Sequence, residues 1–445
     1  MSALKTFARG GVHPYENKLS AGRPIQDLTP PAVVTIPLNM HLGVPAKPIV
    51  NKGDEVKVGQ LIAQGSGFVS ANVHSSVSGK VAKIDKLTDL SGYKSDAVFI
   101  EVKGDEWIEN IDRSKDLHHD NNLIAADIIR RINDAGIVGM GGAAFPSHVK
   151  LTIPRGKKAE YLIINGVECE PYLTADHALM IEKGEELMIG IILLKKALQV
   201  EKAIIGIENN KPDVIDHLGQ IAKKYEGISV QPLKVKYPQG GEKQLIYALL
   251  KRKVPSGGLP IDIGAIVFNV GTTVAVYEAV QKNKPLFERI VTVTGKSIGK
   301  PSNFRVRIGT PVKTLIEACG GLPDDTGKII SGGPMMGKAL ANSEIPVVKG
   351  SSGILIMRES ESKRKVVEAC IRCSKCITVC PLGLEPYLLL ALSRKQLTER
   401  MENEKVLDCI ECGSCSYICP AGRPLLDYIR LGKSDVRKMI SSRKK

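Results

Sequence analysis

The cysteines near the end of the chain form two copies of one pattern. The first copy is Cys370, Cys373, Cys376 and Cys380, followed by Pro381, and the second is Cys409, Cys412, Cys415 and Cys419, followed by Pro420. Three thiolates spaced three residues apart on a tight loop can reach three corners of a cubane iron–sulfur cluster, and the fourth points at a neighbouring cluster. The expected ligand sets are therefore Cys370, Cys373, Cys376 with Cys419, and Cys409, Cys412, Cys415 with Cys380.

Zinc is the alternative reading of these cysteines. Zinc also binds C-x2-C pairs, but it needs four ligands per ion, usually as two separated pairs. A triple run with a fourth cysteine and a proline, repeated intact, favours two [4Fe-4S] clusters over zinc or disulfides. The chain is thus expected to transfer electrons one at a time.

A glycine-rich segment from Gly139 to Lys150 (GMGGAAFPSHVK) is the second informative feature. Glycines let backbone N–H groups approach an anion closely, and a helix that begins near Pro146 adds a favourable dipole. Lys150, one turn into that helix, can bring a positive charge to a phosphate. The order is not the G-x-G-x-x-G dinucleotide fingerprint, and a glycine turn that binds nothing is the alternative.

A polar segment, Asn165 to Tyr172 (NGVECEPY), follows a short apolar strand at residues 161–164. In α/β folds, ligands bind at the carboxyl ends of strands. Asn165 could hydrogen-bond to a flavin edge, and Glu168 or Glu170 to a ribose hydroxyl. A polar loop whose carboxylates only cap helices is the competing reading.

The elements that position these residues change in kind along the chain. Residues 30–104 have short strands and glycine turns, the rhythm of a biotinyl/lipoyl-type β-sandwich, but the tip region 71–76 lacks the carrier lysine, so a structural role is expected. Residues 121–285 alternate helices with apolar strands, which predicts an α/β domain with parallel strands. Residues 288–345 resemble a β-grasp module around one helix at 311–319.

The predicted fold class is multidomain α/β: a lipoyl-like β-sandwich, a Rossmann-like α/β domain, a β-grasp module and a helical two-cluster ferredoxin-like domain. Residues 179–198 are expected to be helical, and one amphipathic helix is expected between the cysteine runs, near 385–401. The predicted boundaries are 1–29 for an N-terminal segment, 30–115 for the lipoyl-like domain, 116–285 for the α/β domain, 286–357 for the β-grasp module and 358–445 for the cluster domain.

The 445 residues carry a formal net charge of +15. Two clusters with their thiolates would remove about four units, so a basic balance remains. Only 4% of the residues are aromatic and no nucleic-acid motif is present, so nucleic acid is not an expected partner. An acidic protein or an anionic membrane surface fits better. The start lacks the apolar region of a signal peptide, no stretch reads as a membrane span, and metal-ligating cysteines suit the cytoplasm.

The glycine loop and the polar segment together resemble the FMN- and NADH-binding subunit of respiratory complex I. Tyr237 with Gly240-Gly241-Glu242, and Asn269-Val270-Gly271-Thr272, resemble two further elements of that site. With the Gly10-Gly11-Val12-His13-Pro14 start, the lipoyl-like module, the β-grasp segment and the doubled cysteine run in this order, nearly the whole chain resembles the RnfC family of the Rnf complex.

The resemblance implies that the Rossmann-like α/β domain is an FMN domain and that the β-grasp module is of the SLBB type. It also implies residue roles and cofactors. Non-covalent FMN and two [4Fe-4S] clusters are the expected cofactors, with NAD(H) as substrate, and no side chain is expected to act as acid or base. The expected flavin-binding residues are Gly139, Gly141, Gly142 and Lys150 at the phosphate, with Asn165, Glu168, Gly240 and Asn269; Phe145, Glu170 and Glu242 are expected to face NAD. Val167 and Gly241 stand where complex I has acidic residues, so contacts there must differ.

The implied function is that of an electron-transfer subunit of a membrane-bound, ion-translocating ferredoxin:NAD+ oxidoreductase. The expected partners are the membrane-embedded and iron–sulfur Rnf subunits, with ferredoxin acting indirectly, and the expected location is peripheral, on the cytoplasmic face of the cell membrane. Two alternatives remain. One is a soluble flavin and iron–sulfur NADH-dependent reductase, such as a microcompartment cobalamin reductase, and the other is a structural iron–sulfur scaffold without nucleotide.

Overall fold

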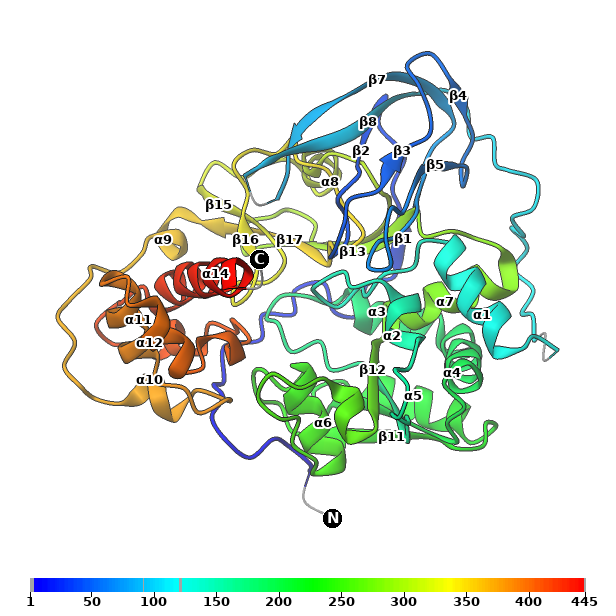
Figure 1. The fold of residues 1–445 in the computed structure, drawn as a ribbon. Coiled ribbons are helices and arrows are strands. Elements are labelled where there is room, and N and C mark those ends of the chain that lie inside the picture. The colour runs from blue at the N-terminus through cyan, green and yellow to red at the C-terminus, as the bar shows by residue number, and fades with distance from the viewer. Residues whose placement is uncertain (1–3, 91, 120–121, 444–445) are drawn as a thin grey trace.

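The computed structural model describes residues 4–90, 92–119 and 122–443. Its elements form four groups in chain order, and the N-terminal segment runs past several of them (Figure 1). The C-terminal helices lie beside the α/β group, and the small β-sheets lie over the β-grasp group.

The lipoyl-like group contains two small sheets, in the orders β2-β8-β7-β4 and β3-β5-β6. Its strands are β2 (Val33–Pro37), β3 (Lys47–Pro48), β4 (Glu55–Val56), β5 (Leu61–Gln64), β6 (Val73–His74), β7 (Gly79–Thr88) and β8 (Lys94–Val102). The tip at residues 71–76 is largely buried. The Ser76 hydroxyl donates to the Ile308 carbonyl at 2.5 Å, and the buried Lys349 ammonium donates to the carbonyls of Asn72 and Gly136 at 2.6 and 2.7 Å. The tip at residues 71–76 therefore packs between the neighbouring modules, and we call this packed tip the wedge.

The α/β group is built on four parallel strands in the order β11-β10-β9-β12. The strands are β9 (Tyr161–Asn165), β10 (Lys202–Glu208), β11 (Ile228–Leu233) and β12 (Ala265–Asn269). The helices are α1 (Ala125–Asp134), α2 (Ser147–Leu151), α3 (Ala175–Glu182), α4 (Gly184–Leu198), α5 (Pro212–Ala222), α6 (Glu242–Leu250) and α7 (Val270–Lys282), with a 3-10 turn η1 (Pro260–Ile263). The chain moves outward from β9 to β11 and then returns to β12, so the strand order reverses between β9 and β12. Ligands bind at such a reversal point.

The residues expected to be helical at 179–198 are helical except for Lys183. They belong to two helices, α3 and α4, which meet at Lys183, whose backbone (φ −126°, ψ 34°) is not helical. Gly184 packs so tightly on α5 that a Cβ there would lie 2.7 Å from Ile221 Cδ1. The break at Lys183 lets α4 pack against α5. It also lets α3 take a different direction and begin near the carboxyl edge of the sheet.

The prediction of one helix between the cysteine runs is wrong. The segment forms α11 (Pro386–Arg394) and α12 (Thr398–Asn403). The break follows from the left-handed Gln396 (φ +54°), and both short helices pack on α14 (Leu425–Arg443). The cluster group also contains α9 (Glu359–Ser362), α10 (Lys375–Thr378), η2 (Val406–Asp408) and α13 (Ser414–Ile418).

The β-grasp group is a six-stranded sheet in the order β1-β14-β13-β17-β15-β16. Its strands are β1 (Ile25–Asp27), β13 (Glu288–Thr294), β14 (Ser302–Arg307), β15 (Thr326–Ser331), β16 (Lys338–Ala339) and β17 (Gly353–Arg358), and the helix expected at 311–319 is α8 (Val312–Ala318). The edge strand β1 comes from the N-terminal segment and pairs in parallel with β14.

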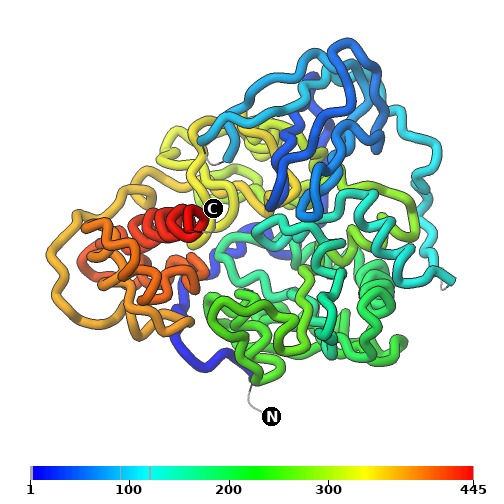
Figure 2. Tube along the Cα trace, viewed as in Figure 1, coloured from blue at the N-terminus to red at the C-terminus, as the bar shows by residue number. Residues whose placement is uncertain are grey.

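Before β1, residues 4–18 form what we call the strap, which passes between the α/β group and the cluster group (Figure 2). The Gly11 N–H donates to the Val379 carbonyl at 2.8 Å, and Val12 exchanges two backbone hydrogen bonds with Tyr237, each of 2.9 Å. The strap thus joins two groups that are far apart in sequence. Across the described part of the chain, every helix is too short or too polar to cross a bilayer.

The wedge at the lipoyl-like tip can be tested with Gly136→Ala. Gly136 has φ +63°, and a Cβ there would lie 2.3 Å from the Asn72 carbonyl oxygen. We expect the substitution to destabilise the protein by roughly 1–3 kcal/mol, measured as a lower midpoint of thermal unfolding. Gly219→Ala is the matched control, because Gly219 lies inside α5 with open space around it and alanine favours a helix by about 1 kcal/mol. Equal midpoints for the two variants would argue against the wedge.

Candidate redox site

The carboxyl ends of β9 and β12 bring the predicted flavin residues together. Asn165 and Asn269 end these strands and are register partners across the sheet. The Asn165 side-chain amide donates to the Gly240 carbonyl at 2.9 Å, so the loop before α6 lies against the end of β9. Three of the predicted residues, from different parts of the sequence, therefore line one edge of the sheet.

The glycine loop lies over Asn269. The Gly139 N–H donates to the Phe145 carbonyl at 2.8 Å, which closes the loop, and a Cβ on Gly141 would lie 3.1 Å from Asn269 Cβ. Gly142 has φ +154°, and nothing lies within 4 Å of the position where its Cβ would point. The loop is thus packed on one side and open on the other, as a backbone cradle for an anion requires.

Asn269 also organises the start of α7. Its side-chain oxygen accepts the N–H groups of Gly271 and Thr272 at 2.9 and 3.3 Å, as an N-cap does. The Thr272 hydroxyl accepts the Met140 N–H at 2.8 Å. The helix cap and the glycine loop therefore hold each other in place.

Lys150 and Glu242 close the other side of this edge. The Lys150 ammonium lies 3.0 Å from Glu242 Oε1 and donates to the Val267 carbonyl at 2.8 Å. Lys150 is in α2, as the sequence predicts, and Glu242 is the first residue of α6. The Lys150 ammonium therefore lies at the sheet edge. Without a bound nucleotide it pairs with Glu242, the carboxylate predicted to face NAD.

Glu168 reaches this region through a left-handed backbone conformation, φ +49°. Its carboxylate accepts the N–H groups of Asp176 and His177 at 2.7 and 3.3 Å. These are the free donors of the first turn of α3, and a carboxylate there is favoured by the helix dipole. Glu168 thus fixes the polar loop against α3, and the capping role expected under the competing reading is present.

Sequence reasoning missed two charged residues of the site, Asp176 and Arg289. Asp176, on α3, accepts the Asn269 amide at 2.7 Å, and Arg289, on β13, donates to the Met140 carbonyl at 3.2 Å. Burial and the nearby Glu168 raise the pKa of Asp176 to about 6, whereas Arg289 opposes that rise. No motif contains either residue, so only the tertiary structure could find them.

Glu170 lies on the far side of the polar loop, at the junction with the β-grasp and cluster groups. Its carboxylate accepts the N–H groups of Met335 and Met336 at 3.2 and 2.7 Å. Burial raises the pKa of Glu170 to about 7, an effect that these hydrogen bonds partly offset. The carboxylate predicted to face NAD therefore already has two partners from the β-grasp loop.

Tyr237 joins the polar loop to the second cysteine run. Its phenol donates to the Cys412 carbonyl at 2.8 Å, and both residues pack with Val12 and Cys169 in a small apolar cluster. Gly413 lies against the β-grasp loop, because a Cβ there would lie 2.7 Å from the Met335 carbonyl oxygen. The second cysteine run is thus in direct contact with the loop before α6, whose Gly240 carbonyl accepts the Asn165 amide.

The two predicted cysteine sets differ in depth. A largely apolar cavity is lined by all four thiols of one set, Cys380, Cys409, Cys412 and Cys415. In the other set, Cys376 and Cys419 are near enough to interact electrostatically, whereas Cys370 and Cys373 are exposed. We call these the inner set and the outer set.

Both cysteine loops have the same backbone turn. Left-handed residues flank the second cysteine of each run, namely Arg372 and Ser374 in the first run and Glu411 and Gly413 in the second. Backbone N–H groups also point at sulfur: Leu384 N–H at Cys380 Sγ (3.3 Å) and Glu411 N–H at Cys409 Sγ (3.4 Å). Such hydrogen bonds are typical of cluster ligands.

Among the described residues, no three Cys, His, Asp or Glu side chains close around a single metal ion. The inner cavity and the repeated turns fit a larger group.

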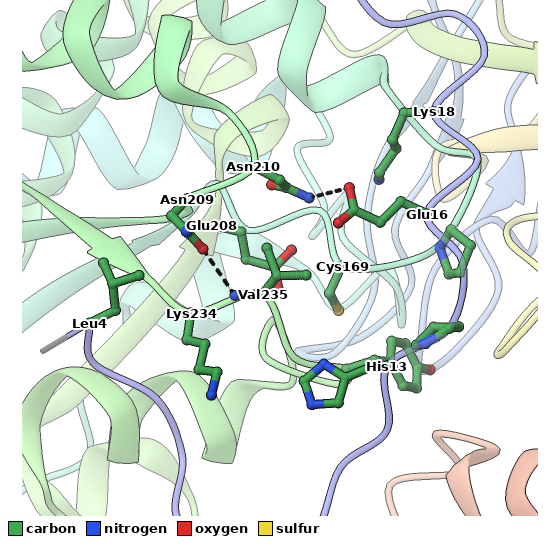
Figure 3. A pocket seen from close by; sticks show the side chains of 13 residues that line it. Leu4, His13, Glu16, Lys18, Cys169, Glu208, Asn209, Asn210, Lys234 and Val235 are labelled. Carbon is green, nitrogen blue, oxygen red and sulfur yellow. Dashed lines mark hydrogen bonds between the residues drawn. The ribbon is translucent and has the colours of Figure 1, made fainter.

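A separate cavity of about 650 Å3 lies beyond the carboxyl ends of β10 and β11 (Figure 3). It is lined by strap residues and by Cys169, Glu208 and Tyr237. Glu208 is buried, and burial raises its pKa to about 7 although Lys211, Lys18 and the Lys236 N–H favour its charged form. This cavity adjoins Cys169 of the polar loop, and its lining residues include none of the predicted flavin-binding residues.

Comparison with protein families gives the domain types. The model of the Nuo51 FMN-binding domain matches residues 132–278, and that of the RnfC barrel sandwich hybrid domain matches residues 6–105. The SLBB domain matches residues 290–339, and the 4Fe-4S dicluster domain matches residues 357–420. These matches confirm the predicted fold class and the predicted cofactors, FMN and two [4Fe-4S] clusters.

Curated proteins match over almost the whole chain. The chain is 48% identical to the C subunit of the proton-translocating ferredoxin:NAD(+) oxidoreductase complex of Clostridium ljungdahlii, covering 98% of this chain and 94% of that protein. It is 44% identical to the Na(+)-translocating counterpart of Acetobacterium woodii, with 98% of each covered. It is 39% identical to the C subunit of the ion-translocating oxidoreductase complex of Rhodobacter capsulatus, with 87% and 75% covered.

The buried Glu208 predicts a pH dependence of stability. Its folded-state pKa of about 7 lies above the ordinary value of 4.5, so ionisation is harder in the folded protein than in the unfolded chain. The stability that Glu208 contributes is complete below pH 4.5 and is lost as the pH rises to about 7, by up to about 3 kcal/mol. We expect Glu208→Gln to flatten the fall in unfolding free energy between pH 5 and 7, measured by urea denaturation. Asp216→Asn, an exposed change on α5, should keep the wild-type slope. A wild-type slope in Glu208→Gln would show that Glu208 titrates normally.

Proposed function

This chain belongs to the RnfC family, and on that basis we propose that it transfers electrons between [4Fe-4S] clusters and NAD(H) through FMN. It does so as a subunit of a membrane-bound, ion-translocating ferredoxin:NAD+ oxidoreductase. Relatives named for that activity align with nearly the full chain. The observation that carries the proposal is the Tyr237–Cys412 hydrogen bond, since it links the second cysteine run to the loop that carries Gly240, one of the predicted flavin-binding residues.

For the flavin, the proposal assigns binding and orientation to the residues at the β9 and β12 edge. Gly139, Gly141, Gly142 and Lys150 would hold the phosphate through backbone N–H groups and one ammonium. The other flavin-binding residues are Asn165, Glu168, Gly240 and Asn269. The bound flavin supplies the exchange between a two-electron hydride and single electrons. The chain contributes a fixed cradle in which Glu168 acts mainly by capping α3.

For NAD(H), the proposal assigns Phe145, Glu170 and Glu242. Phe145 closes the glycine loop and is partly exposed. Glu242 is paired with Lys150, and Glu170 with the β-grasp loop, so a nucleotide that contacts either carboxylate must share it with a present partner. No side chain is assigned as acid or base.

For the clusters, the proposal assigns Cys380, Cys409, Cys412 and Cys415 to the inner cluster. Cys370, Cys373, Cys376 and Cys419 would hold the outer cluster. The inner set adjoins Tyr237, and two outer thiols are exposed. Electrons would therefore pass between the flavin and the protein surface through the inner set and then the outer set.

As a member of this family, the chain has other subunits of the complex as partners. We further propose that it binds peripherally at the cytoplasmic face of the cell membrane, next to membrane-embedded and iron–sulfur subunits, and exchanges electrons with ferredoxin only indirectly. Recovery in washed membranes together with hydrophobic subunits would support this. Recovery only in the soluble fraction would instead favour a soluble reductase, and purification without flavin would favour a scaffold.

The inner cluster can be tested with Cys415→Ser. We expect about eight iron atoms in the anaerobically purified wild-type chain and about four in the variant, because one of the two clusters loses a ligand. Iron and acid-labile sulfide are counted against protein. Cys319→Ser is the matched control, since Cys319 is buried in the β-grasp core. Equal iron in wild type and Cys415→Ser would contradict the assignment.

The flavin cradle can be tested with Lys150→Ala. Loss of an ammonium that binds phosphate should weaken FMN binding roughly ten- to hundredfold, measured by quenching of FMN fluorescence. NADH should bleach the flavin absorbance of the wild-type protein. Lys157→Ala removes a nearby lysine that instead pairs with Asp262, and it should bind FMN as wild type does. Wild-type affinity in Lys150→Ala would exclude Lys150 from the phosphate site.

A further inference from the structure

One side chain of the β-grasp module, that of Arg289, reaches the glycine loop of the predicted flavin site. Arg289, on β13, is only 6% exposed. Its guanidinium donates to the Ser351 carbonyl at 2.9 Å and to the Met140 carbonyl at 3.2 Å. Met140 lies between Gly139 and Gly141, so a residue of one module fixes the backbone of a loop in another.

The same cation acts on a carboxylate behind Asn269. Asp176 Oδ2 accepts the Asn269 amide at 2.7 Å, and Asn269 underlies Gly141. Arg289 favours the charged form of Asp176, and Asp176 opposes the fall that burial causes in the pKa of Arg289. Arg289 and Asp176 thus favour each other's charged forms without a direct ion pair, and two further charges act on Asp176: Glu168 disfavours its ionisation and Lys211 favours it.

We propose that Arg289 is a positioning residue of the flavin site, which holds the glycine loop through Met140 and neutralises Asp176 behind Asn269. The β-grasp module is then part of the flavin site. This inference rests on the proposed flavin function and extends it to a module that none of the predicted flavin residues belongs to.

The electrostatic part of the proposal has a definite sign. Without the Arg289 cation, only Lys211 and the Asn269 amide still offset an ionised Asp176. Its negative charge then acts more strongly on a site that binds a phosphate and a flavin that gains negative charge on reduction. FMN binding should weaken most at a pH above the pKa of Asp176, and the midpoint potential of the bound flavin should fall. Removal of the carboxylate should reverse both effects.

The test is FMN binding to the full-length apoprotein of wild type, Arg289→Gln, Arg289→Lys and Arg289→Gln/Asp176→Asn. We expect roughly ten- to hundredfold weaker binding for Arg289→Gln at pH 8, a smaller loss at pH 5.5, and recovery in the double variant. Arg289→Lys should retain the pH profile of wild type with a partial loss of affinity. A merely structural arginine would give a pH-independent loss that Asp176→Asn does not relieve.

Arg305→Gln is the matched control. Arg305 lies on the neighbouring strand β14 and pairs with Glu288 and Asp27, so its loss perturbs the module away from the glycine loop. It should leave the FMN affinity and flavin potential unchanged. If Arg305→Gln and Arg289→Gln weaken FMN binding equally, the proposal is wrong.

A second readout needs no flavin. Hydrogen–deuterium exchange of the apoprotein should be faster at residues 139–145 in Arg289→Gln than in wild type or Arg305→Gln. Unchanged exchange there would overturn the positioning role. Failure of wild type to bind FMN would overturn the proposed function, and the exchange experiment would still decide whether Arg289 holds the loop.

Discussion

The contact between Tyr237, in the loop before α6, and the second cysteine run is the constraint on which the rest of the structure depends. Electrons pass between centres only if those centres stay close, so two separately folded groups must be held in one arrangement. Tyr237, only 2% exposed, packs against Cys412 and bonds to its carbonyl. Burial of a large side chain contributes roughly 1.5–3 kcal/mol, which alone is modest. The strap adds a second link, since Val12 pairs with Tyr237 while Gly11 bonds to Val379.

The strap explains the glycines at the start of the chain. A Cβ on Gly10 would lie 2.6 Å from the Cys380 carbonyl carbon, and one on Gly11 would lie 2.9 Å from the Tyr237 carbonyl oxygen. Both residues have positive φ. A larger residue at Gly10 would collide with the backbone at Val379 and Cys380, and one at Gly11 would collide with Tyr237. The two glycines therefore let the strap lie closely between the cluster group and the α/β group.

The local patterns in the sequence predict the parts of the site that depend on backbone and spacing. The doubled cysteine run, the glycine loop before α2 and the strand that ends at Asn165 all form as expected. The parts that depend on tertiary packing could not be predicted. The helix breaks at Lys183 and Gln396 follow from packing on α5 and α14, and apolar periodicity continues across them. The partners of Glu170 come from a turn more than 160 residues away.

The buried lipoyl-like tip shows how one module can support a site without contributing chemistry. A carrier needs an exposed, mobile tip, whereas here the Lys349 ammonium is enclosed and bonds to the carbonyls of Asn72 and Gly136. Burial lowers the pKa of Lys349 to about 7, so this link has an electrostatic cost that a surface lysine would avoid. The link fixes the position of the lipoyl-like module relative to the glycine loop. A residue of that module, Leu42, donates its N–H to the Ala144 carbonyl of the loop at 3.1 Å. With Arg289 on one side and the lipoyl-like module on the other, the loop is held before any ligand binds. A site held in this way loses less entropy on binding than a loop that must fold around its ligand.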